Sequence, residues 1–381
     1  MNIPRKLTAG LIVLSAILIA CSNAKYTSGL NIGPNFGAGT LYVSNSTQNG
    51  LSIYNASAAS GKGPAYQIGG GSTGLDGPQY IAFDKRNNIW VTNYDPTTQS
   101  AAIVEFESQA TGNVIPYGLI AGAAGGVTRP RGIAINTTTG QVIVANVDPA
   151  FTGGFANQLL LFNTSSALIH ATAPGTIIAG PLTGLNVPSG IALNNYSAYV
   201  TNLQGASVEE FAIPTPTPTP TPPTPSPSPT PSPSPTPTAP TPTPSPTPTP
   251  MNVAPTLVLS GNLTGITQPS GVAVDGSGNV YVSDEGNLSV KPAILIFPPG
   301  LSGTQNVAPT CKISGANTTL FQPTDVALDA SGNIYVADTT ASGAGIVDVW
   351  SGISPTCGTV NVAPSKTFTA VGIPIGLNIL P

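Results

Sequence analysis

Short apolar stretches alternate with polar residues and turns along most of the chain. In "QPSGVAVDGSGNVYVSDEG", which begins at Gln268, two alternating runs flank the turn Asp-Gly-Ser-Gly-Asn. An apolar-polar period of two is typical of a strand with one buried face, and Asp and Gly are the residues of tight turns. The pattern therefore predicts a β-hairpin rather than a helix.

This hairpin pattern recurs five times. Each unit begins with a proline and a polar residue, usually followed by glycine, and continues with an alternating strand that ends in Asp or Asn, a turn and a second strand. The marker prolines that open the units are Pro78, Pro130, Pro188, Pro269 and Pro323. A third and a fourth short strand follow in each unit. Repeats of about 50 residues with four strands each are typical of β-propeller blades.

The two ends of the repeat region complement each other. "GTLYVSNSTQNGLSIYN", from Gly39, contains the second and third strands of a blade that lacks a first strand, and "IPIGLNIL", from Ile373, is a first strand without a successor. Pairing them closes the ring and removes the open sheet edges. We therefore expect an all-β protein, a six-bladed β-propeller of four-stranded blades that is closed by pairing the C-terminal strand with the first blade.

A Pro/Thr/Ser-rich tract, residues 214–250, interrupts the repeats. A third strand, "SVEEFAI", precedes it and a fourth strand, "TLVLSG", follows it. The phrase "NVAP" after the tract recurs at Asn306 and Asn361, each time before a fourth strand. Proline at nearly every second position prevents helix formation and sheet pairing. We expect a disordered insertion within the fourth blade, not a linker between domains.

The N-terminus has the features of a targeting segment. A basic region, "MNIPRK", precedes an apolar run that ends in "LIAC" at Cys21. This order resembles the lipobox of bacterial lipoproteins, in which the cysteine becomes the lipidated first residue. The resemblance implies a signal peptide at 1–20, a lipidated tether at 21–38 and a propeller at 39–381. It also implies an extracytoplasmic protein anchored in the cell envelope, and Ser22 favours the outer membrane if the host has two membranes.

Composition narrows the range of partners. Only 7% of the residues are charged, the net charge is −4 and no basic cluster is present. Nucleic-acid binding needs clustered Lys and Arg, so we expect no nucleic-acid partner. We expect a monomer that meets the membrane through its lipid. Cys311 and Cys357 form a disulfide or remain free thiols, since an extracytoplasmic location permits both.

The repeat resembles the NHL-repeat family of six-bladed propellers. The resemblance is carried by the stretches "P-x-G-[IV]-A-[VIL]-[DN]" and by "GN-[IV]-Y-V-[SA]-D" at Gly278 and Gly332. Members and relatives of this family include platforms that bind proteins, RNA or glycans, as well as lactonases and lyases. The resemblance thus implies a fold more specifically than an activity.

Candidate binding residues lie where a unit departs from the repeat. Tyr80 and Asp325 stand where other units have glycine. Both follow a marker proline at the beginning of a first strand, and we place this end of the strands at the channel mouth. Gln79 and Arg131 directly follow marker prolines. These four residues are the predicted ligand-binding positions. The recurrent Asp and Asn at the turns and strand ends are expected to bond nearby backbone instead.

Catalytic chemistry has little support in the sequence. The single histidine, His170, lies in a loop. The glutamates at 105, 107, 209 and 210 are expected on third strands, toward the outside of the ring. No nucleophile motif or phosphate loop is present. We predict a non-catalytic module that binds a protein, peptide or glycan in the cell envelope, without catalytic residues, metal or cofactor. The alternative is a metal-dependent hydrolase or lyase of the lactonase or streptogramin-lyase type that acts at the channel mouth.

The lipid anchor gives a direct prediction. Replacing Cys21 by Ala removes the thiol that would carry the lipid, so the protein should leave the membrane fraction or accumulate unprocessed. Metabolic labelling with a palmitate analogue, followed by fractionation, measures both effects. A wild-type protein that stays in the membrane but incorporates no label would contradict lipidation.

Overall fold

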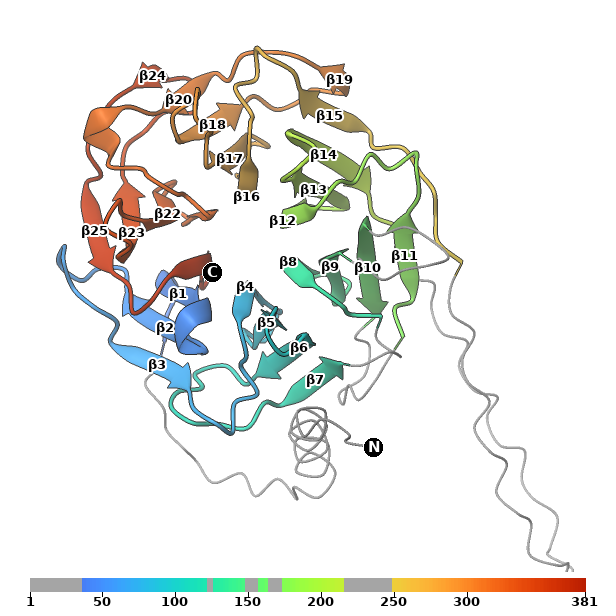
Figure 1. Cartoon of the computed structure of the whole chain (residues 1–381), viewed down its shortest axis with the longest axis vertical. Helices are drawn as coiled ribbons and strands as arrows, with labels where there is room; N and C mark the ends of the chain where they lie inside the picture. The colour runs from blue at the N-terminus through green and yellow to red at the C-terminus, as the bar shows by residue number, and fades with distance from the viewer. Residues whose placement is uncertain (1–35, 122–125, 148–156, 164–172, 216–248) are drawn as a thin grey trace, which may run out of the picture.

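Six antiparallel sheets surround a common axis in the computed structural model, which describes residues 36–121, 126–147, 157–163, 173–215 and 249–381 (Figure 1). Cys21, His170 and most of the Pro/Thr/Ser-rich tract lie outside the described residues. Within the described part, no helix is long and apolar enough to cross a membrane. The predicted all-β, six-bladed propeller is confirmed.

Each blade has four antiparallel strands, ordered from the ring axis outward. They are β26 (Pro374–Ile379), β1 (Thr40–Asn45), β2 (Gly50–Asn55) and β3 (Tyr66–Gly69) in the first blade; β4 (Pro78–Phe83), β5 (Ile89–Asp95), β6 (Ser100–Phe106) and β7 (Gly118–Ala121) in the second; β8 (Pro130–Asn136), β9 (Gln141–Val147), β10 (Asn157–Asn163) and β11 (Thr176–Ala179) in the third; β12 (Pro188–Asn194), β13 (Ser197–Asn202), β14 (Ser207–Ala212) and β15 (Leu257–Ser260) in the fourth; β16 (Pro269–Val274), β17 (Val280–Asp284), β18 (Ala293–Phe297) and β20 (Cys311–Ile313) in the fifth; and β21 (Asp325–Leu328), β22 (Ile334–Thr339), β23 (Gly345–Trp350) and β25 (Lys366–Thr369) in the sixth. Two single-turn 3₁₀ helices, η1 (Ser46–Gln48) and η3 (Ala316–Thr318), lie in loops.

The ring closes as the sequence predicts. Strand β26 pairs antiparallel with β1, placing Leu377 opposite Val43 and Ile379 opposite Leu41. Figure 1 shows the last strand beside the first blade, which joins both ends of the described chain in one sheet.

The hydrophobic core lies between blades. One buried cluster joins Tyr281 and Ile296 of the fifth blade with Val336 and Trp350 of the sixth. Similar clusters fill the other seams. A blade on its own would leave both faces in water, so each depends on its neighbours.

A bulge near the start of the inner strands connects neighbouring blades. In the fourth blade the register shifts between Pro188 and Ile191. The hydroxyl of Thr201 accepts a hydrogen bond from the Gly190 N–H (2.7 Å) and donates one to the Ser270 carbonyl of the fifth blade (2.7 Å). The Thr201 hydroxyl thus provides a hydrogen-bond partner for backbone groups that the bulge leaves without a partner in the sheet. Buried backbone N–H and C=O groups require such partners.

The recurrent Asp residues bond backbone, as expected. Asp275 Oδ1 accepts from the N–H groups of Ser277 and Asn279 in the turn, both at 2.9 Å. At the end of the second strand, Asp284 accepts from the Thr267 and Gln268 N–H groups. Their recurrence therefore has a structural cause.

Outer strands are linked around the circumference. Strand β15 pairs in parallel with β19 (Gly303–Gln305), and β20 with β24 (Gly358–Val360), so the fourth and fifth sheets gain a fifth strand from the next blade's loop. The "NVAP" asparagines support this contact: Asn306 Oδ1 accepts from the Leu263 N–H at 2.9 Å. We call these contacts the outer belt.

The tract interrupts a single blade. Strands β14 and β15, which flank it, are hydrogen-bonded neighbours. Directly after the tract, Met251 exchanges backbone hydrogen bonds with Ile177 and Ala179 of the third blade. Residues 298–310 make the equivalent connection in the fifth blade, so the tract enlarges a loop that other blades also possess.

A disulfide joins Cys311 and Cys357, whose Cα atoms lie 4.7 Å apart. Cys311 belongs to β20 of the fifth blade, and Cys357 directly precedes β24 in the loop of the sixth. The bond therefore connects two blades within the outer belt, and resolves the alternative that the sequence left open.

Candidate functional site

The inner strands enclose an axial cavity of about 280 Å³. Apolar residues such as Phe83, Ile135 and Leu193 form most of its wall. Tyr80 and Asp325, the two departures from the repeat, both line it. The sequence therefore identified two of the three polar side chains that line this cavity, the third being Asn378.

Tyr80 extends across the end of this cavity. Its hydroxyl lies 3.2 Å from Ser189 Oγ, 3.2 Å from the Ser270 carbonyl and 3.4 Å from the Thr324 carbonyl. These partners follow the marker prolines of the fourth, fifth and sixth blades, so one side chain from the second blade contacts half of the ring. Burial raises the pKa of Tyr80 to about 12. The phenol thus closes the channel at its marker-proline end.

Asp325 joins the sixth blade to the closing strand. Its Oδ2 accepts from the Leu377 N–H and its Oδ1 from the Val326 N–H, both at 2.9 Å. Only 5% of the residue is exposed. Burial raises its pKa to about 8, although both backbone bonds favour the charged form. Its position indicates a role in ring closure, in contrast to an exposed ligand-binding group.

Glycine at the equivalent positions has a steric reason. A Cβ atom at Gly132 would collide with the backbone of Ser189, and one at Gly271 would collide with Asp325. The inner strands approach one another too closely for six side chains. Tyr80 and Asp325 are the two exceptions that this crowded layer accommodates.

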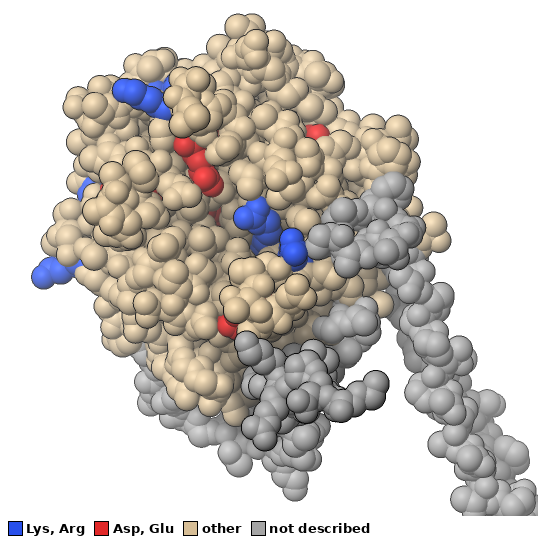
Figure 2. Space-filling model, viewed as in Figure 1, with Lys and Arg blue, Asp and Glu red and all other residues tan. Residues whose placement is uncertain are grey.

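Charged groups border the channel mouth outside Tyr80. Glu285 is partly exposed; burial raises its pKa, while its bonds to Gln322 and Ser270 and the charge of Arg131 oppose that rise. The Arg131 charge also acts on Tyr80. Figure 2 shows basic side chains beside the centre of this face and acidic ones nearby, on a surface with few other charges.

The structure places all four predicted binding residues one or two positions after marker prolines, at one end of the channel. Tyr80 and Asp325 are buried, and Arg131 remains partly exposed. Gln79 is partly exposed, and its side-chain N–H donates to the Gly77 carbonyl at 3.0 Å. Glu285 was missed, although its place directly after a strand-ending Asp was a usable signal.

Glu105 and Glu209 lie on the third strands β6 and β14, as expected, but their side chains are not exposed there. Glu105 and Glu209 are 5% and 4% exposed. Both carboxyls face a neighbouring element: Glu105 accepts from Asn88 Nδ2 at 2.8 Å, and Glu209 lies against Gly184 of the preceding blade. Burial raises the pKa of each to about 7. Each third strand is an interior strand of its sheet, between the second and fourth strands.

Comparison with known proteins agrees with this fold. Residues 267–291 match the NHL repeat, and the chain is an NHL-like six-bladed propeller. None of the curated proteins compared has a matching sequence.

Two solved structures illustrate the likeness. A chain of the nidogen/laminin complex is 14% identical with a TM-score of 0.52, covering 91% of this chain and 99% of that one. A protein from Bacteroides uniformis described as a 6-phosphogluconolactonase candidate is 10% identical with a TM-score of 0.52, covering 90% and 99%. At these identities the likeness establishes the fold alone.

Asp325 gives a prediction about pH. An acid whose pKa is about 8 when folded and near its ordinary 3.8 when unfolded binds more protons in the folded state between those values. The free energy of unfolding should therefore fall as pH rises from about 4 to about 8. Asp325→Asn should make this decline shallower, because the amide does not ionise. The variant should also lose one of the two hydrogen bonds that Asp325 accepts from backbone N–H groups, which should lower the free energy of unfolding by about 1–3 kcal/mol.

Urea unfolding at pH 5 and pH 8 measures both quantities. Asp84→Asn is the matched control, because Asp84 accepts backbone bonds in a hairpin turn away from the closing strand. An Asp325→Asn variant with the wild-type pH dependence would show that the buried carboxyl is not the source of the decline.

Proposed function

We propose that the protein is a non-catalytic binding module of the cell envelope, with its binding surface at the channel mouth on the marker-proline face. The observation that carries this proposal is the closure of the channel by Tyr80. A ligand arriving at this face meets a closed floor with Arg131 and Glu285 beside it, rather than an open passage.

The surface suits a protein or peptide segment. Arg131 and Glu285 offer opposite charges close to the axis, and Phe321, which is 50% exposed, adds an apolar contact. Mixed charge with an exposed aromatic ring is typical of binding hot spots. The charges would set the orientation of the segment and the aromatic ring would contribute buried area.

The hydrolase or lyase alternative has less support. Within the described part of the chain, no three His, Cys, Asp or Glu side chains are grouped so that they could hold a metal ion. Asp325 is the acidic residue that lines the channel. Both of its carboxylate oxygens already accept hydrogen bonds from backbone N–H groups. No described residues therefore favour this alternative.

The proposed lipid anchor agrees with an outward-facing mouth. Strand β1 runs antiparallel to β26, whose Pro374 lies at the marker-proline end. The chain therefore enters β1 at Thr40 on the opposite face. A tether from Cys21 would approach that opposite face, leaving the mouth directed away from the membrane.

Site-specific photocrosslinking in intact cells tests the binding surface. A photoreactive amino acid at Gln322, which is exposed beside Glu285, should give a discrete crosslinked product. The same group at Lys85, in a hairpin on the opposite face, is the control and should not give that product. Adding Arg131→Glu should abolish the Gln322 product, because it reverses the charge at the mouth.

A product that persists unchanged in the Arg131→Glu variant would contradict binding at the mouth. Metal-dependent hydrolysis of a lactone by the purified protein, lost in Asp325→Asn, would instead support the enzymatic alternative. These two outcomes separate a misplaced binding surface from a misassigned function.

A further inference from the structure

A second cavity, of about 700 Å³, lies between the first and sixth blades, on the face opposite the channel mouth. In every other blade a hairpin turn joins the first and second strands at this level. In the first blade those strands are β26 and β1, which no hairpin connects. Gly39 and Thr40 instead exchange backbone bonds with Leu380, both at 2.8 Å. The cavity thus occurs at the unique break in the repeat.

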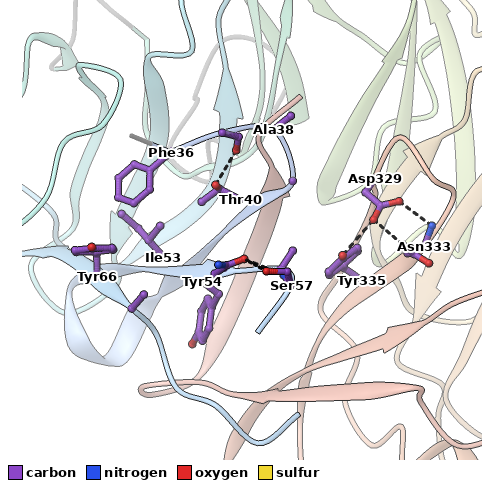
Figure 3. A pocket seen from close by; sticks show the side chains of 15 residues that line it. Phe36, Ala38, Thr40, Ile53, Tyr54, Ser57, Tyr66, Asp329, Asn333 and Tyr335 are labelled. Atoms are coloured by element: carbon purple, nitrogen blue, oxygen red, sulfur yellow. Dashed lines mark hydrogen bonds between the residues drawn. The ribbon is translucent and has the colours of Figure 1, made fainter. Parts of the chain in front are cut away.

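One wall of the cavity is aromatic. The rings of Phe36 and Tyr66 meet edge to face, with centroids 5.3 Å apart and planes at 71°. Tyr66 is 43% exposed, which is unusual for a strand aromatic in this protein. Figure 3 shows these two rings across the cavity from Asp329, Asn333 and Tyr335. An exposed ring beside a second ring forms a platform for a flat apolar surface.

The opposite wall is polar, but its charge is already engaged. Asp329 Oδ1 accepts from the Ser331 and Asn333 N–H groups, and its Oδ2 accepts from Asn333 Nδ2 (2.7 Å) and the Tyr335 hydroxyl (3.2 Å). The fifth blade repeats this arrangement around Asp275. Asp329 is therefore a structural residue whose bonds do not depend on a ligand.

Nearby cationic charge is engaged as well. Lys366 Nζ donates to the carbonyl of Ala56, a cavity residue, at 2.8 Å and lies over the Phe368 ring. The cavity therefore presents no free charge of either sign. A charged ligand would lose hydration without gaining an ion pair, which disfavours anionic and cationic ligands.

Uncharged hydrogen-bonding groups remain available. Asn55 Oδ1 accepts from the Ser57 N–H (2.9 Å) and Oγ (2.7 Å), which holds the amide in place. Among the described residues, neither Asn55 Nδ2 nor the Tyr66 hydroxyl has a hydrogen-bond partner. A fixed amide donor and a phenol thus face the same space as the aromatic platform.

We propose that this cavity binds a neutral oligosaccharide. A pyranose ring has an apolar face of C–H groups that packs on an aromatic ring, and an edge of hydroxyls that accept from an amide N–H and donate to a phenol oxygen. The volume falls within the range of small-molecule sites and accommodates one or two sugar rings. This site is independent of the channel mouth and lies on the face where the tether enters, so it would bind glycan on the anchored side.

Calorimetric titration of the purified full-length protein with cellotriose, maltotriose and tri-N-acetylchitotriose tests the proposal. At least one of the three should bind, and Tyr66→Ala should weaken its binding tenfold or more by removing the platform. Asn55→Ala should weaken it severalfold. Tyr196→Ala is the matched control, because Tyr196 is 49% exposed in a turn of the fourth blade, and should bind like wild type.

Equal melting temperatures of the variants would show that the losses arise at the cavity. The proposal is overturned if none of the three saccharides binds, or if Tyr66→Ala and Tyr196→Ala behave alike. Preferential binding of trigalacturonate would overturn the neutral ligand class. Displacement of the saccharide by a Pro-Thr repeat peptide with higher affinity would identify the cavity as a polyproline site instead.

Discussion

The pairing of β26 with β1 is the contact on which the rest of the structure depends. These strands are separated by almost the entire described sequence, yet they form adjacent strands of one blade. Each seam buries apolar side chains from two blades, so an open ring would expose one complete seam as well as two strand edges. Closure therefore determines whether every blade has two neighbours.

Polar contacts at the closing blade reinforce this pairing. Ser44 accepts from the Gly376 N–H at 2.9 Å and donates to the Gln79 carbonyl of the second blade. Asp325 provides the matching contact from the sixth blade through the Leu377 N–H. The closing strand is thus bonded to both neighbours near the axis, while the outer belt and the disulfide hold the circumference. Both proposed binding surfaces lie where the repeat is interrupted. The channel mouth lies at the two side chains that replace glycine in the inner layer, and the second cavity lies at the first blade, where no hairpin joins the first and second strands.

The parts of this architecture that were predictable from the sequence are those encoded locally. Alternating strands, Asp-Gly turns and the spacing of the marker prolines identified blades, closure and the place of the tract without any knowledge of packing. Tyr80 and Asp325 were recognisable as departures from glycine. Their burial was not, because it depends on how six strands converge. The contact of Glu209 with Gly184 and the disulfide depend likewise on packing between blades, which a strand-by-strand interpretation does not contain.

Native-state hydrogen exchange tests closure most directly. Amides that open only when the whole molecule unfolds exchange with the global free energy of unfolding, whereas a strand that detaches separately exchanges with a smaller one. A closed, mutually dependent ring predicts that the Leu377 amide in β26 exchanges with the same free energy as the Val144 amide at the centre of β9. Exchange at Leu377 through a separate opening several kcal/mol less costly would contradict the view that the closing strand holds the ring together.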